Sequence, residues 1–203
     1  RPADFADFWR QALEESAKIP LDVKMTPAPE KSTPQVDAYK ISFATLGGRR
    51  IYGWYARPKA PGKYPGRLRC PSSGIYPLNN PEIMPDTCNL WIMITGFDVD
   101  LSNMPAGDDP GKRYWTAGID SPQTSMWRTI YVSLVRALDF LAAQPEVDAN
   151  RLIVTGGSQG GGLALAVAAL DPRIKLCVPS YFGMARLDWT VKYAPGYWPF
   201  DMK

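Results

Sequence analysis

The glycine-rich turn at residues 156–162, Gly-Gly-Ser-Gln-Gly-Gly-Gly, constrains the fold of this chain more than any other stretch. Residues 151–155 before it are predicted to form a short buried strand, and residues 163–170 after it a buried helix. The turn matches Gly-x-Ser-x-Gly around Ser158, the pattern of a nucleophile elbow, in which a sharp strand-to-helix turn lifts a serine hydroxyl out of the sheet. A plain glycine-rich connection is the alternative, and the order of strand, turn and helix favours the elbow.

The glycines on either side of the serine have a steric reason. A Cβ two residues before or after it, at Gly156 or Gly160, would collide with the neighbouring helix or strand, and glycine also tolerates unusual backbone angles. The helix that follows would direct its N-terminal N–H groups toward the place where an oxyanion forms. Phosphate-binding loops are excluded, because no spacing satisfies Gly-x-Gly-x-x-Gly and no lysine follows Gly161.

Composition limits the class of protein and its partners. The 203 residues are 45% apolar, which suits one domain spanning residues 1–203 with a sizeable core. A net charge of +3 without a basic stripe disfavours nucleic acid and anionic membranes, and no apolar run is long enough to span a bilayer. Small or neutral molecules are the expected partners, and self-association stays open. Because the chain begins with Arg1, a removed export signal would leave no trace, and we favour a secreted or periplasmic compartment.

Cysteine and histidine usage bears on chemistry. Cys70, Cys88 and Cys177 have no metal-ligand spacing, and their odd number argues against a disulfide framework, so we expect buried free thiols and no metal site. The sequence contains no histidine. A serine hydrolase of the usual kind needs a general base near neutral pH, and histidine normally fills that role.

Strand and helix patterns alternate along the rest of the chain. Residues 36–45 and 50–56 flank Gly47-Gly48 and predict a β-hairpin, which follows an amphipathic helix that begins near Asp4. A further helix is predicted from Ser121 to about residue 144. The alternation predicts an α/β fold with a mostly parallel sheet and helices on both faces. The other predicted strands are residues 21–25, 63–70, 89–95 and 174–178.

Several stretches form a recognisable set. Gln159 directly follows the serine of the elbow, whereas most hydrolases have another residue at that position. Residues 127–138 and 145–148 lead up to it, and residues 46–53 form the hairpin turn. Together these stretches resemble the acetyl xylan esterase and cephalosporin-C deacetylase family of α/β-hydrolases, carbohydrate esterase family seven, and the resemblance extends from Asp4 to about residue 181.

The resemblance implies deacetylation of acetylated sugars or xylan oligosaccharides through an acyl-serine intermediate, without a metal or organic cofactor. It implies Ser158 as the nucleophile and the backbone N–H groups of Gln159 and Ile75 as the oxyanion donors. Ile75 replaces a tyrosine of the family, and the donor survives because it is main chain. The family's Arg-Gly-Gln motif is absent, and residues 96–98, Gly-Phe-Asp, take its place. In this family the catalytic Asp and His follow two later strands, so we expect them beyond Lys203, in a C-terminal part of the fold that these residues lack.

Three functional hypotheses stay open. The favoured one is a serine esterase whose Asp and His lie outside residues 1–203. A non-catalytic carbohydrate-binding or interaction protein on a hydrolase fold is supported by the missing histidine and opposed by the intact elbow at Ser158. An amidase or peptidase is the weakest, because nothing marks an amide-binding pocket. Four tryptophans could stack on sugar rings, although packing in the core or at an interface is the better interpretation of each: Trp115, Trp127, Trp189 and Trp198.

Overall fold

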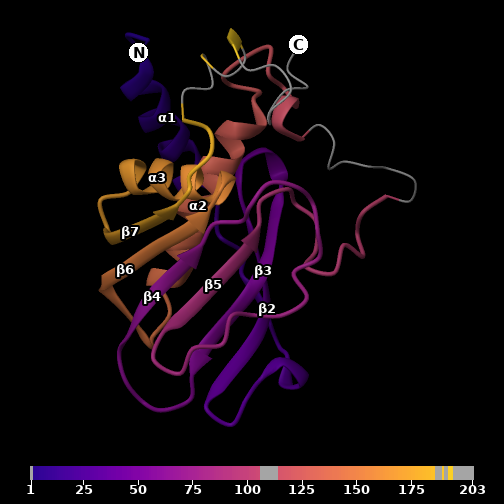
Figure 1. Ribbon diagram of the computed structural model, residues 1–203, viewed down its shortest axis with the longest axis vertical. Helices are drawn as coiled ribbons and strands as arrows, with labels where there is room; N and C mark the ends of the chain where they lie inside the picture. The colour runs from indigo at the N-terminus through magenta and orange to yellow at the C-terminus, as the bar shows by residue number, and fades with distance from the viewer. Residues whose placement is uncertain (1, 106–113, 186–188, 190–191, 194–203) are drawn as a thin grey trace.

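The computed structural model describes residues 2–105, 114–185, 189 and 192–193, which build one seven-stranded sheet of order β1-β2-β3-β5-β4-β6-β7 (Figure 1). Strands β5, β4, β6 and β7 are paired in parallel, whereas β1, β2, β3 and β5 are joined by antiparallel pairs, so all strands except β1 and β3 run in one direction. The predicted mostly parallel sheet is therefore confirmed. The bounds are β1 Lys24–Pro27, β2 Val36–Ala44, β3 Arg50–Pro58, β4 Tyr64–Arg69, β5 Cys88–Met93, β6 Val147–Gly157 and β7 Ile174–Ser180.

The N-terminal part follows the prediction closely. Helix α1 (Phe5–Ala17) is followed by the β2–β3 hairpin, whose turn contains Gly47 and Gly48, both with φ of 68°. An L-residue with a side chain rarely adopts this conformation, which explains the glycine pair. The first strand begins later than predicted, because Asp22 has φ of 43° and cannot belong to an extended strand.

Helix α2 (Met126–Ala142) begins five residues after the predicted start at Ser121. Residues 118–125 form hydrogen-bonded turns instead, in which the Thr124 hydroxyl donates to the Gly118 carbonyl at 2.9 Å. The helix is capped by Ser125, whose hydroxyl accepts the Trp127 backbone N–H at 3.3 Å. A serine cap satisfies an otherwise unpaired N–H, so this residue, rather than Pro122, determines where the helix starts.

The described helices cover one face of the sheet. Helix α2 contacts β4, β5 and β6, helix α3 (Gln159–Leu170) contacts β6 and β7, the two helices contact each other, and α1 packs on α2 (Figure 1). Tyr55 and Phe140 are among the largest fully buried side chains on this face, and their rings meet edge to face at 5.3 Å. Burial of such rings is the main stabilising contribution of a core like this one.

On the opposite face the described residues place no α-helix. The β4–β5 connection contains prolines at 71, 77, 81 and 85, and proline inside a helix removes a hydrogen bond and clashes with the preceding turn. This irregular connection covers the face instead, where Leu78 and Val99 pack against Trp54 of β3. Because neighbouring residues of a strand point to opposite faces, Trp54 and Tyr55 lie in two separate cores.

The three cysteines are free thiols, as predicted. Cys70 and Cys88 are buried and Cys177 is partly buried, and burial raises the pKa of each thiol, that of Cys88 to about 11. Protonated thiols are poor nucleophiles, so these side chains are suited to packing. Within the described ranges, no helix has the length and apolarity needed to cross a bilayer.

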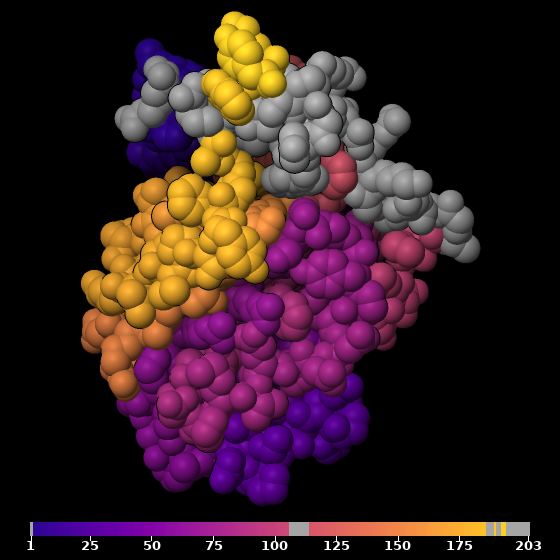
Figure 2. Space-filling model, in the orientation of Figure 1, coloured from indigo at the N-terminus to yellow at the C-terminus, as the bar shows by residue number. Residues whose placement is uncertain are grey.

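Strand β7 forms an edge of the sheet in the part of the chain that the structure describes, where it pairs only with β6. Leu176 and Val178 on this strand are 51% and 44% exposed, and in Figure 2 the orange surface of β6 and β7 forms one flank of the molecule. An exposed apolar edge strand is a template for pairing with another chain. We expect residues 1–203, expressed alone, to self-associate through this edge.

Replacing both Leu176 and Val178 by Lys should shift the 203-residue chain toward the monomer, as measured by sedimentation velocity. Leu165→Lys is the matched control, because Leu165 is 40% exposed but lies on α3 rather than on the edge strand. A wild-type chain that is monomeric at the same micromolar concentration, or equal effects of the edge and control variants, would contradict this prediction.

Candidate active site

Ser158 lies between β6 and α3, at the carboxyl end of the strand, with φ of 55° and ψ of −124°. This combination is sparsely populated for a residue with a side chain and costs about 1–3 kcal/mol, so the surrounding structure must hold it in place. The strand is longer than predicted, and the helix begins at Gln159, directly after the serine. Ser158 therefore has the backbone geometry of an elbow rather than that of a plain connection.

Two glycines permit this turn. A Cβ at Gly156 would lie 2.2 Å from the Gly160 carbonyl oxygen, and a Cβ at Gly160 would lie 2.4 Å from the Cys70 carbonyl oxygen. Both obstacles are backbone atoms, which cannot rotate away as a side chain could. The elbow thus touches the end of β4, which Cys70 follows.

Residues 180–184, from the last residue of β7 onward, hold the elbow from the other side. The Ser158 N–H donates to the Ser180 carbonyl at 3.2 Å. An added Cβ at Gly157, Gly161 or Gly162 would lie within 3.0 Å of this segment, which explains the remaining glycines of the run. The Ser158 carbonyl accepts three backbone N–H groups, those of Gly161 at 3.0 Å, Gly162 at 3.3 Å and Gly183 at 2.7 Å.

The backbone N–H and the side chain of Gln159 have different surroundings. Its N–H is the first of helix α3 and has no acceptor among the described residues, so it is free to bind an anion at the helix N-terminus. Its side chain is 0% exposed, and its Oε1 accepts a hydrogen bond from the Tyr114 hydroxyl at 2.5 Å. The other amide atom, Nε2, is buried without a partner among the described residues.

Ile75 lies at the same end of the sheet as Ser158, because it follows β4 and Ser158 follows β6, the neighbouring parallel strand. It lines a cavity of about 270 Å³ together with Phe97. Ligands of α/β sheets bind at the carboxyl ends of the strands, so this cavity is in the expected position. The residues lining it are Arg49, Ile75, Thr95, Phe97, Tyr114, Ala117 and Met126.

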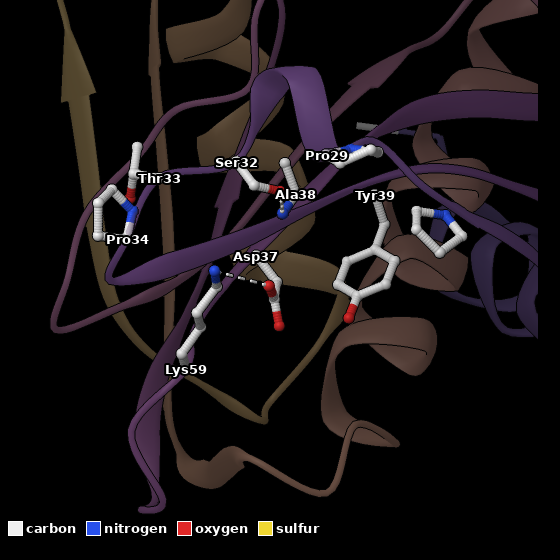
Figure 3. A pocket seen from close by; sticks show the side chains of 9 residues that line it. Pro29, Ser32, Thr33, Pro34, Asp37, Ala38, Tyr39 and Lys59 are labelled. Atoms are coloured by element: carbon white, nitrogen blue, oxygen red, sulfur yellow. Dashed lines mark hydrogen bonds and ion pairs between the residues drawn. The ribbon is translucent and has the colours of Figure 1, made fainter.

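A second cavity, of about 470 Å³, lies at the opposite end of the sheet. Its wall includes residues 37–39, at the start of β2, which runs in the same direction as β6. Figure 3 shows Lys59 reaching across it to Asp37, with an ion-pair distance of 3.5 Å. It is therefore separate from the site around Ser158.

The described residues supply no base to the serine. Among them no side chain accepts a hydrogen bond from Ser158 Oγ, and the whole sequence lacks histidine. The same residues contain no cluster of three or more His, Cys, Asp or Glu side chains that could hold a metal ion. A serine without a base is a weak nucleophile at neutral pH.

The tryptophans and the long segment before α2 can now be placed. Trp115 is 9% exposed, and its carbonyl accepts the Trp127 indole N–H at 2.9 Å, so packing is the use of both. Trp189 is 49% exposed, and Trp198 lies outside the described residues. Tyr114 was not singled out by the sequence, and residues 106–113 directly before it lie outside the described ranges.

Known proteins resemble this chain in sequence and in fold. The chain matches the family described as Acetyl xylan esterase (AXE1) over residues 1–69 and 96–191. It is 31% identical over 210 residues to the acetyl esterase Axe7A of Xylanibacter ruminicola, covering 98% of this chain and 47% of that protein. The acetyl xylan esterase from Paenibacillus sp. R4 superposes with a TM-score of 0.78 at 30% identity, covering 97% of this chain and 65% of that one.

A second solved structure shows the fold alone. Acetyl Xylan Esterase 1 from Thermoanaerobacterium sp. JW/SL YS485 superposes with a TM-score of 0.80 at 23% identity, covering 98% of this chain and 65% of that one. The chain thus spans about half the length of the curated relative. Ser158, Gln159 and Tyr114 lie within the residues matched to the family, whereas Ile75 lies in the unmatched stretch at residues 70–95.

Proposed function

This chain belongs to the acetyl xylan esterase family, and on that premise we propose that it carries the nucleophile of a serine esterase that removes acetyl groups from acetylated sugars or xylan oligosaccharides. The observation that carries the proposal is the strained backbone of Ser158 at the carboxyl end of β6, next to an N–H at the start of α3 that has no acceptor in the part of the chain that the structure describes. The names of the similar esterases support the same substrate class.

The proposed reaction has two halves. Ser158 Oγ attacks the acetyl carbonyl while a base takes its proton, and the negative charge that forms on the carbonyl oxygen is stabilised by the N–H groups of Gln159 and Ile75. The C–O bond to the sugar then breaks, and the sugar oxygen leaves with the proton. Water attacks the acetyl-serine in the second half, releasing acetate and restoring the serine.

We propose that the base and its orienting carboxylate, a His and an Asp, come from residues outside these 203. Two facts support this: the sequence has no histidine, and the chain corresponds to only 47% of the curated relative. The second hypothesis, a carbohydrate-binding protein without catalysis, is supported by the missing hydrogen bond to Ser158 Oγ among the described residues. The two hypotheses differ in whether acetate is released.

The test compares the full-length gene product with residues 1–203 alone on acetylated xylo-oligosaccharides, with acetate release followed by NMR. We expect the full-length protein to release acetate, and residues 1–203 to be slower by about 10²–10⁴-fold, because general-base help is missing. Oligosaccharide binding by the full-length protein without acetate release would favour the binding hypothesis. Comparable turnover by both would show that the base lies within residues 1–203.

A further inference from the structure

The hydrogen bond between Tyr114 and Gln159 joins two buried side chains. Tyr114 is 7% exposed and Gln159 is 0% exposed, and the hydroxyl donates to Oε1 at 2.5 Å. Since Gln159 Nε2 has no partner among the described residues, this bond is the one polar contact of the amide there. It therefore fixes the rotation of the side chain of the residue that directly follows Ser158.

Tyr114 also lies near the segment that contains the second proposed donor. It lines the same cavity as Ile75, and the backbone N–H of Gly74, the residue before Ile75, lowers the pKa of its hydroxyl. Burial raises the pKa of Tyr114 and outweighs the opposing effects of Gln159 and of this N–H, so the hydroxyl stays protonated at neutral pH and remains a donor. One side chain thus contacts Gln159 and lies against the segment that contains Ile75.

We propose that Tyr114 is a positioning residue that holds Gln159 and the Gly74-Ile75 segment at the separation that an oxyanion hole requires. The proposal rests on the function proposed above. Oxyanion donors act only when they lie about 2.7–3.1 Å from the developing charge, and a misplacement of about 1 Å can cost about a hundredfold in rate. In this proposal Tyr114 acts on the reaction through the two backbone donors and takes no part in bond making or breaking.

The aromatic ring of Tyr114 has separate support. It packs edge to face on Trp115, with ring centroids 5.0 Å apart, and lies 6.4 Å from the ring of Trp127. Tyr114→Phe keeps this packing and removes only the hydroxyl. Tyr131→Phe is the matched control, because Tyr131 packs on the same Trp127, at 6.0 Å, is partly buried in the same core, and makes no hydrogen bond to Gln159 among the described residues.

In the full-length protein, Tyr114→Phe should lower kcat on an acetylated sugar by about ten- to hundredfold and leave KM within about twofold, because the lost interaction matters in the transition state. Tyr131→Phe should leave both constants within about twofold. If Tyr114→Phe behaves like Tyr131→Phe, or raises KM with kcat unchanged, the positioning role is refuted.

A double-mutant cycle tests whether Tyr114 acts through Gln159. Gln159→Met removes the amide oxygen that accepts the hydrogen bond from the Tyr114 hydroxyl, and it keeps the length of the side chain. In that background Tyr114→Phe should change kcat by less than about twofold, since the coupled partner is already absent. A kcat loss as large as in the wild-type background would show that Tyr114 acts by another route and would overturn the proposal.

A second readout separates this proposal from the proposed function. If the wild-type protein releases no acetate from any acetyl ester, the esterase function fails, and the rate of reaction with a fluorophosphonate then reports on the site. In that reaction Ser158 Oγ forms a bond to phosphorus, loses its proton and displaces fluoride. Slower labelling of Tyr114→Phe by about tenfold or more, with Tyr131→Phe unchanged, supports positioning. Equal labelling rates of all three proteins overturn it.

Discussion

Ser158→Ala in the full-length protein is expected to lower kcat for acetyl release by about 10⁴-fold or more, with little change in the free energy of unfolding. The substitution removes the only atom that forms the acyl bond, and the backbone of the elbow is held by groups other than the hydroxyl. These are the N–H groups that bind the Ser158 carbonyl and the Ser180 carbonyl that accepts its N–H. The measurement is acetate release at saturating substrate, together with urea denaturation of both proteins.

Ser180→Ala is the control for this experiment. Ser180 ends the neighbouring strand β7 and is exposed, and it serves the elbow through its carbonyl rather than its side chain. It should retain kcat within about twofold. If Ser158→Ala retained a substantial fraction of the wild-type kcat, Ser158 would not be the nucleophile.

Gly160→Ala should be among the most damaging single-methyl changes within the described residues. The added Cβ would lie 2.4 Å from the Cys70 carbonyl oxygen and 2.9 Å from the Pro71 carbonyl oxygen, so α3 or the end of β4 must move. Overpacking of this kind costs about 3 kcal/mol or more when the obstacle is backbone, and we expect that loss in the free energy of unfolding. Because a shift of α3 also displaces the Gln159 N–H, we expect kcat to fall by about a hundredfold as well.

Gly183→Ala provides the matched glycine. Its Cβ would meet its nearest neighbour, the Ser158 carbonyl carbon, at 3.4 Å, which is ordinary contact. We expect the free energy of unfolding to change by less than about 1 kcal/mol, measured by urea denaturation alongside Gly160→Ala. Equal losses in the two variants would show that the elbow is no tighter on the β4 side than on the side of residues 180–184.

The sequence predicted those features that are encoded locally. Gly-Gly between two strand patterns predicted the hairpin, because a positive φ at Gly47 and Gly48 is a property of the residues themselves. The elbow was predicted from local sequence as well, because glycines at 156 and 160 permit a tight strand-to-helix turn that a Cβ at either position would obstruct. The start of α2 was misplaced because a proline at 122 satisfies the helix rule and the turn rule equally, and tertiary contacts decide between them.

Other features depend on residues distant in the sequence. One face of the sheet is covered by the proline-containing connection in place of a helix. This arrangement depends on the packing of Leu78 and Val99 against Trp54, which lies far from both in the sequence. The role of Tyr114 depends on a contact with Gln159, and nothing in the local pattern around either residue indicates it. Convergence of the Gln159 and Ile75 N–H groups on one oxyanion stays a prediction, as does the source of the catalytic base.

The clamp on the elbow also fixes an order of assembly. Residues 180–184 supply an acceptor and a donor to Ser158, and they follow it in the chain, at the end of β7 and beyond. On a ribosome, where the chain emerges from its N-terminus, the strained serine conformation therefore lacks half of its support until β7 has docked beside β6. A nascent chain that ends within α3 has the glycine-rich turn in its sequence but has not yet received the contacts that hold its nucleophile in place.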